Sequence, residues 1–300
     1  MPPKPGASKK EKMAMARREK KQQVEEAADS FRRGLNLYRS SKSFDDYEEA
    51  CTHFTLAITL RHGNARYHFG RGNCLRMMGE YQKAHQDYSA AIRLDNAVSL
   101  YYANRALCRR KNNQFEDSLS DYSHAIRLER LPNANFHFNR AVVHYEMENY
   151  ELAIKDYTVA IADDKHTFRV LYNRGNCYRK LKRLEESVAD LTKATTVEPG
   201  SSSGYNNLGL TLFELERYAE AAKNFTEAIM IAPENATYYN NRGLAYYQDT
   251  NLDDAIQDLD QAVRLDSAEM PDPNFYFNRG NARLAKNEPE RALEDFNEVR

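Results

Sequence analysis

Tryptophan is absent from the 300-residue sequence, and glycine and proline are scarce, at 12 and 9 residues. Sandwiches and barrels turn back on themselves every few residues and need more of both, so the composition argues against them. No apolar run approaches the roughly 18 residues of a membrane span, which excludes a transmembrane protein. Because 41% of the residues are hydrophobic, there is still material for a packed interior. We therefore predict a soluble, helix-rich protein with no membrane partner.

Motifs for chemistry are also missing. The four cysteines include no C-x-x-C spacing, and the eight histidines form no H-E-x-x-H motif. Cys74, Cys108 and Cys177 recur at one place in a pattern with a period of about 34 residues, so we interpret them as small buried hydrophobic residues. No glycine-rich phosphate loop is present. The sequence predicts no catalytic residue, no metal site and no cofactor, and so no enzyme.

The formal net charge of −1 conceals two unlike regions. Through Val24 the chain carries eight basic residues against Glu11 and Glu19, a net charge of +6, which leaves −7 for the rest. We interpret residues 1–30 as a basic arm, disordered to helical, in which residues 9–30 favour a helix that continues past residue 30. The arm is a solvated tail, a contact for an acidic surface such as tubulin tails, or a contact for nucleic acid. Nucleic acid ranks last because the arm has no interleaved aromatic residues. No secretory signal is recognisable, so a cytoplasmic location is expected.

The period of about 34 residues organises residues 31–300. Small residues recur, and twelve residues after each comes a second small residue, followed four residues later by a large apolar one. The first small residues are Gly72, Ala106, Ala141, Gly175, Gly209, Gly243 and Gly280. Taking these as repeat position 8, the repeats begin near residues 65, 99, 134, 168, 202, 236 and 273. A divergent first repeat begins near residue 27, with four extra residues in its turn.

Each repeat is predicted to be a helical hairpin, because small residues at two facing places let antiparallel helices approach closely. Gly79, Asn113 and Asn287 lie where a first helix must end, and each residue tolerates a left-handed cap.

The pattern resembles the tetratricopeptide repeat family, as in Tyr205-Asn206-Asn207-Leu208-Gly209 followed by Ala221, Phe225, Ala228 and Pro233. One departure is that tyrosine or histidine takes the place often given to tryptophan. The resemblance implies an all-α, right-handed superhelix (an α-solenoid) of about eight helix–turn–helix repeats whose first helices line a concave face. Because the last repeat stops at its position 28, we expect the array to continue past residue 300.

A charged pair recurs at repeat positions 7 and 23. Its members are Arg71/Asp87, Arg105/Asp121, Arg140/Asp156, Arg174/Asp190, Arg242/Asp258 and Arg279/Asp295. In the sixth repeat both are lost together, as Leu208 and Asn224. The joint loss favours a structural ion pair across each hairpin rather than a ligand contact.

Asparagine occupies repeat position 6 in six consecutive repeats, as Asn104, Asn139, Asn173, Asn207, Asn241 and Asn278. An amide can hydrogen-bond the main chain of an extended peptide whatever the side chains of that peptide. The row looks like the asparagine ladder in the repeat domain of O-linked N-acetylglucosamine transferases. The alternative is that asparagine partly serves packing there.

Basic residues flank the asparagine row, and we place Arg76, Arg110, Lys111, Arg179 and Lys180 in the predicted groove. The expected ligand is an extended, partly acidic segment of another protein. A clamp of the kind that binds chaperone tails is disfavoured, because repeat position 5 is never lysine.

The sequence thus predicts a non-catalytic scaffold that binds extended peptide segments of other proteins. One alternative is the substrate-recruiting region of a larger enzyme, glycosyltransferase-like, with a catalytic domain beyond residue 300. Another is a structural component of a cytoskeletal or ciliary assembly.

Overall fold

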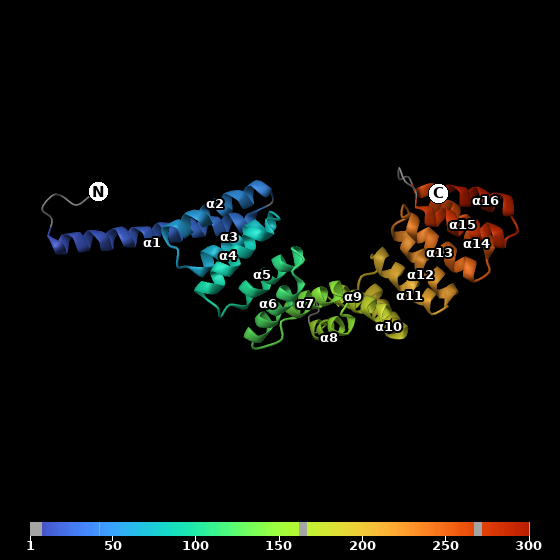
Figure 1. Cartoon of the computed structure of the whole chain (residues 1–300), viewed down its shortest axis with the longest axis horizontal. Coiled ribbons are helices and arrows are strands. Elements are labelled where there is room, and N and C mark those ends of the chain that lie inside the picture. The colour runs from blue at the N-terminus through green and yellow to red at the C-terminus, as the bar shows by residue number, and fades with distance from the viewer. Residues whose placement is uncertain (1–7, 42, 162–166, 267–271, 300) are drawn as a thin grey trace. The chain divides into compact units, whose positions relative to one another are not determined.

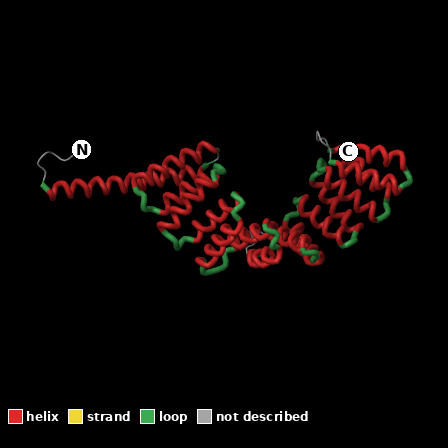
Figure 2. The backbone as a smooth tube through the Cα atoms, viewed as in Figure 1, coloured by secondary structure: helices red, strands yellow, loops and turns green. Residues whose placement is uncertain are grey.

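The computed structural model describes residues 8–41, 43–161, 167–266 and 272–299. Over these residues all regular secondary structure is α-helical, which confirms the predicted class (Figures 1 and 2). Sixteen described helices follow one another along the chain, consistent with about eight repeats. They are α1 Lys9–Ser40, α2 Phe44–Leu60, α3 Ala65–Met77, α4 Tyr81–Leu94, α5 Ser99–Lys111, α6 Phe115–Leu128, α7 Ala134–Glu146, α8 Tyr150–Ala160, α9 Thr167–Lys180, α10 Leu184–Val197, α11 Ser202–Glu214, α12 Tyr218–Ile231, α13 Ala236–Gln248, α14 Leu252–Leu265, α15 Pro273–Ala285 and α16 Pro289–Glu298.

The chain forms two compact units, Met1–Met147 and Glu148–Arg300, which we call the N-terminal and C-terminal units. Within each unit every helix packs on the next one along the chain. Alternate helices also touch, as α5 touches α7 in the N-terminal unit and α11 touches α13 in the C-terminal unit. Each unit is therefore a stack of helical hairpins, in which first helices neighbour first helices.

The spacing of each hairpin depends on a small residue at repeat position 8. Phe225 on α12 is fully buried and lies against Gly209 on α11. A Cβ atom added to Gly209 would lie 2.6 Å from Cε1 of Phe225, closer than real contacts allow. Gly243 is crowded in the same way by Leu259, at 2.9 Å. The small residue thus lets the large side chain of the second helix reach the backbone of the first.

The turn inside each hairpin holds its central residue in the left-handed region. The seven residues at repeat position 15 have positive φ, namely Gly79 (80°), Asn113 (58°), Glu148 (59°), Lys182 (58°), Glu216 (60°), Thr250 (61°) and Asn287 (67°). The prediction for Gly79, Asn113 and Asn287 is confirmed; the other four were not recognised from the sequence. The residue at repeat position 16 caps the end of the first helix by donating its backbone N–H to a carbonyl of the last turn. For example, Asn251 N–H donates to the Tyr246 carbonyl at 2.9 Å.

Helix α1 is one helix from Lys9 to Ser40, so residues 9–30 of the arm and the first helix of the first repeat are continuous. Ser8 and Glu11 form a capping box at its start, where Ser8 N–H donates to Glu11 Oε2 at 2.8 Å. Its buried residues, Ala27, Ser30 and Gly34, all lie in its second half. The first half extends beyond α2 (Figure 1). Residues 1–7 of the arm lie outside the described residues.

None of the described helices has the length and apolar character needed to cross a bilayer.

Thr250 is predicted to carry strain, because a β-branched residue is disfavoured at a φ of 61°. We expect Thr250→Gly to raise the free energy of unfolding by about 1 kcal/mol, since relief of this strain exceeds the extra backbone entropy of glycine. Urea unfolding followed by circular dichroism measures the change. Gly79→Thr, at the same repeat position, is the matched reverse variant and should be destabilised. An unchanged or lower stability of Thr250→Gly would show that the turn carries no such strain.

Candidate peptide-binding groove

The arginine at repeat position 7 donates two hydrogen bonds to the aspartate at position 23. In the fifth repeat, Nε of Arg174 lies 2.6 Å from Oδ2 of Asp190, and its Nη2 lies 2.8 Å from Oδ1. Equivalent contacts are Arg71–Asp87, Arg105–Asp121, Arg242–Asp258 and Arg279–Asp295. All five aspartates are buried, so each pair ties the two helices of a hairpin together through a desolvated, charge-assisted contact.

Two predicted positions stand apart from this set. Arg140 lies on α7 of the N-terminal unit and Asp156 on α8 of the C-terminal unit, so their pairing stays a prediction. In the sixth repeat Leu208 is buried among apolar residues, while the Asn224 amide donates to the Glu220 carbonyl of its own helix at 2.9 Å. An apolar contact therefore replaces the ion pair at that hairpin.

A third member of each pair was missed from the sequence. The remaining Nη1 of the arginine donates to a hydroxyl on the second helix of the preceding repeat, as Arg242 does to Thr226 Oγ1 at 2.9 Å. The acceptors lie at repeat position 25 and are Thr55, Ser89, Ser123, Thr158 and Thr226, with Asp260 in the last case. One arginine thus joins its own hairpin and the hairpin before it. A hydroxyl recurring every 34 residues or so was the available signal.

The environment of Asp87 shows how these contacts respond to pH. Burial alone would raise the pKa of this carboxyl, but hydrogen bonds from Arg71 and His68, together with their charges, outweigh burial and lower it below 3.8. The lowered pKa contributes stability that is present above the unfolded-state value and is lost as the pH falls through the folded-state value. The contact is therefore fully formed at neutral pH.

The six predicted asparagines lie half-buried on first helices. Asn104 and Asn139 are on α5 and α7 of the N-terminal unit, which touch each other. Four more follow on the first helices of the C-terminal unit, where α9, α11, α13 and α15 touch in succession. These are Asn173, Asn207, Asn241 and Asn278.

Side-chain hydrogen bonds link the asparagines to the neighbouring first helix. Asn241 Nδ2 donates to Asn206 Oδ1 at 2.9 Å, and Asn278 Nδ2 donates to Asn240 Oδ1 at 2.8 Å. Asn207 donates to the Tyr172 hydroxyl in the same way. The acceptor is at repeat position 5 of the preceding repeat each time. One of two amide N–H groups is therefore used, while the side-chain oxygen accepts no hydrogen bond from a described residue.

In the N-terminal unit the same amides bond differently. Asn104 Nδ2 lies 3.3 Å from Asn73 Oδ1, and Asn139 Nδ2 donates to the Asn135 carbonyl of its own helix at 2.8 Å. The regular linkage is thus a property of the C-terminal unit.

Two of the predicted basic groove residues are neutralised within the chain. Arg110 contacts Glu146 at 2.7 Å, and Arg179 contacts Glu214 at 3.0 Å. Each glutamate is on the next first helix, at repeat position 13. The other three predicted residues, Arg76, Lys111 and Lys180, make no ion pair with a described residue, and both lysines are exposed.

The thiols of Cys74, Cys108 and Cys177 are buried, and burial raises the pKa of each to about 12. Among the described residues no group of three or more His, Cys, Asp or Glu side chains is placed to hold a metal ion.

Sequence profiles of the tetratricopeptide repeat match residues 65–97, 104–166, 168–201, 206–270 and 250–300. The chain belongs to the tetratricopeptide repeat family. Among curated protein sequences, none matches. The repeats support a general role as a protein-interaction scaffold.

Solved structures with this fold resemble the chain at low identity. A tetratricopeptide repeat protein from Parabacteroides merdae ATCC 43184 is 23% identical over 78% of this chain and 91% of its own, with a TM-score of 0.60. YrrB, described as having an unusual peptide-binding site, is 20% identical over 66% and 97%, with a TM-score of 0.55. MamA from Desulfovibrio magneticus RS-1 is 22% identical over 55% and 92%, with a TM-score of 0.52. Such likeness establishes the fold.

Arg242 and Asp258 are predicted to stabilise the seventh repeat as a unit. Asp258→Asn should cost about 2–3 kcal/mol, because it leaves a desolvated guanidinium without its counter-charge. The double variant Arg242→Leu with Asp258→Asn reproduces the residues of the sixth repeat and should cost less than the sum of the two single variants. A double-mutant cycle by urea unfolding should give a coupling of about 1–3 kcal/mol. Additive effects would contradict the pairing.

Proposed function

We propose that this chain is a non-catalytic scaffold that binds extended peptide segments along the asparagine-bearing first helices. The observation that carries the proposal is the row of position-6 asparagines in the C-terminal unit. Three of them have one amide N–H that donates to the residue at repeat position 5 of the preceding repeat, and an oxygen without a donor among the described residues. Fixed amides of this kind suit recognition of a main chain, since they are oriented before the peptide arrives.

The spacing of the row agrees with an extended ligand. Packed helices lie roughly 8–10 Å apart, and an extended chain advances about 3.3 Å per residue. Each asparagine would therefore meet the main chain at about every third residue. Four asparagines suit a segment of about ten residues, bound with little dependence on its side chains.

The basic residues near the asparagine row indicate where acidic residues of the bound peptide should lie. Because Arg110 and Arg179 are paired with glutamates of the next repeat, they attract an acidic ligand less than their exposed neighbours do. An acidic residue of a segment bound to the C-terminal unit is expected opposite Lys180, which is exposed and makes no ion pair with a described residue. In the N-terminal unit Lys111 is exposed and free of described ion pairs in the same way.

The asparagine row is tested with the triple variant Asn173→Ala, Asn207→Ala, Asn241→Ala. Displayed ten-residue peptides are first selected on the unaltered chain, and one selected peptide is then titrated against each variant. We expect affinity to fall about tenfold or more, because several main-chain hydrogen bonds of about 1 kcal/mol each are lost. Asn224→Ala is the matched control, since its amide bonds its own helix backbone. If the triple variant binds the peptide as tightly as the unaltered chain does, at an unchanged melting temperature, the asparagines do not take part in binding.

The first half of α1 supplies a second contact, for an acidic surface such as tubulin tails. With 100° between successive residues of a helix, Lys9, Lys20, Arg17, Lys10 and Lys21 fall within about 120° of one face. These side chains are exposed. A basic helical face of exposed side chains, of which Lys21 also contacts Glu25 of the same helix at 3.9 Å, suits a charged partner held mainly by Coulomb attraction.

Co-sedimentation with microtubules tests this contact. The full chain is expected to pellet with microtubules at low salt and to be released as salt rises, because screening weakens exposed charges. A chain lacking residues 1–24 should stay in the supernatant. If both chains pellet equally, or neither does, the arm is not a tubulin contact.

A cytoplasmic, cytoskeletal or ciliary setting fits such a partner and is part of the proposal. The larger-enzyme alternative makes a different prediction, namely an α/β catalytic domain encoded after residue 300.

A further inference from the structure

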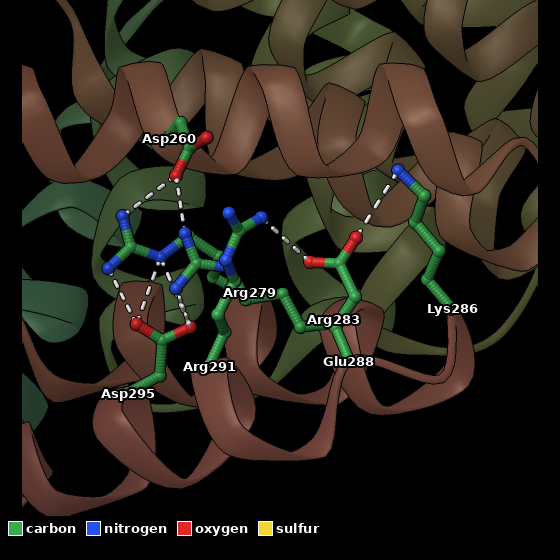
Figure 3. A network of polar contacts seen from close by, with 7 residues as sticks. All are labelled: Asp260, Arg279, Arg283, Lys286, Glu288, Arg291 and Asp295. Atoms are coloured by element: carbon green, nitrogen blue, oxygen red, sulfur yellow. Dashed lines mark hydrogen bonds and ion pairs between the residues drawn. The ribbon is translucent and has the colours of Figure 1, made fainter.

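A balanced cluster of four charges connects the last repeat to the repeat before it (Figure 3). Asp260, on the second helix of the preceding repeat, accepts from Arg279 Nη1 at 2.9 Å and from Arg283 Nη2 at 3.2 Å. Asp295 accepts from the same two arginines, from Arg279 Nη2 at 2.6 Å and from Arg283 Nη1 at 3.0 Å. Two cations and two carboxylates therefore neutralise one another.

The third repeat has the same two arginines at the same repeat positions, 7 and 11. Arg105 Nη2 contacts Asp121 Oδ1 at 2.7 Å, and Arg109 Nη1 contacts Asp121 Oδ2 at 2.7 Å. The place of Asp260 is taken by Ser89, whose Oγ accepts from Arg105 Nη1 at 3.1 Å. In the second and in the fourth to seventh repeats, position 11 holds no arginine; the residues there are Leu75, His144, Tyr178, Leu212 and Tyr246.

The cluster around Ser89 is short of one negative charge. Among the described residues the ion pairs of Arg105 and Arg109 are with Asp121, so these three paired groups sum to +1, against zero for the four groups around Asp260. His85 and the carboxylate of Asp117 lie near the cluster without an ion pair to either arginine, and Arg109 Nη1 also donates to the Asp117 carbonyl at 3.3 Å. The hydrogen bond that Arg283 Nη2 gives to Asp260 has no counterpart, because Arg109 Nη2 has no hydrogen-bond partner among the described residues. Arg109 Nε is buried without a partner, but so is Arg283 Nε in the last repeat, so this atom does not distinguish the two clusters. Arg109 Nη2, a hydrogen-bond donor with a positive charge, therefore lacks the carboxylate acceptor that Asp260 provides in the last repeat.

The groups around this position are partly exposed, since the side chains of Arg105 and Arg109 keep 16% and 17% of their surface accessible. Between the first and second repeats, a cavity of about 440 Å³ lies among α2, α3 and α4. It is lined by the corresponding residues, Thr55, Arg71, Leu75 and Asp87. Asp260, which fills the position in the last repeat, has 37% of its side chain exposed. A ligand group can approach Ser89 in the same way, since this serine is only half-buried.

We propose that Ser89, Arg105 and Arg109 form a binding site for a carboxylate, separate from the asparagine row. The carboxylate takes the place that Asp260 holds in the last repeat. It accepts from Arg105 Nη1, Arg109 Nη2 and the Ser89 hydroxyl, and it brings the cluster to zero net charge. The carboxylate belongs to an aspartate or glutamate of a protein partner or to a small free acid.

The test exchanges the two clusters in the full chain. The probe is sodium malonate, and melting temperatures are compared with those in sodium chloride at equal ionic strength. Malonate at about ten times its dissociation constant should raise the melting temperature of the unaltered chain by about 2–4 °C. Ser89→Asp supplies the carboxylate internally, so it should melt higher in chloride and lose this response. Asp260→Ser opens a second site, so it should melt lower in chloride and respond more strongly than the unaltered chain.

Thr226→Asp is the matched control, because it adds a carboxylate at the same repeat position beside Arg242 but with Tyr246 at position 11. Thr226→Asp should keep the full malonate response. Comparing it with Ser89→Asp in the same salt also corrects for the general effect of malonate on stability. A peptide of four glutamates, at equal carboxylate concentration, distinguishes the sources: a larger shift than with malonate identifies a protein side chain, and an equal or smaller one a small acid. If Ser89→Asp responds to malonate as Thr226→Asp does, or Asp260→Ser gains no response, the site does not exist.

Discussion

The close approach of the two helices in each hairpin is the constraint on which the rest depends. A single Cβ at Gly209 would force Phe225 aside, and Phe225 is the fully buried centre of its repeat. Every other contact assumes this distance. The arginine at position 7 reaches the aspartate at position 23 only because the backbones are close enough for both prongs of the guanidinium to engage. Packing therefore comes first, and the polar contacts select one register among those that packing allows.

The arginines carry this register from one hairpin to the next. With two hydrogen-bond donors on its own hairpin and a third on the preceding one, Arg242 connects three helices. Where Leu208 replaces the arginine, hydrophobic burial in a cluster with Leu191 and Phe225 performs the same structural task. A stack of nearly identical hairpins can thus vary one joint without altering its neighbours, because each contact is confined to adjacent repeats.

The sequence predicted what recurs and missed what depends on neighbouring repeats. The all-α class and the number of repeats followed from the 34-residue period. Left-handed turns were foreseen at Gly79, Asn113 and Asn287 but not at Thr250, because the repeat geometry imposes this conformation on a residue that disfavours it. The pairing of Arg179 with Glu214 was out of reach, since it joins position 12 of one repeat to position 13 of the next. That contact depends on how repeats stack, which no single repeat encodes.

Because α1 is one continuous helix, its basic residues lose little backbone entropy when they bind a partner. Because the helix runs from its cap at Ser8 into the packed residues after Ala27, its basic side chains keep fixed spacings, with about 18 Å of helix between Lys9 and Lys21. A disordered tail would lose roughly 1–2 kcal/mol of backbone freedom per residue on being ordered. Here that freedom is already lost when the chain folds. The helical part of the arm, from Lys9 onward, is a rigid template. Any adjustment of spacing must come from the partner, so a flexible acidic chain suits it better than a rigid acidic surface.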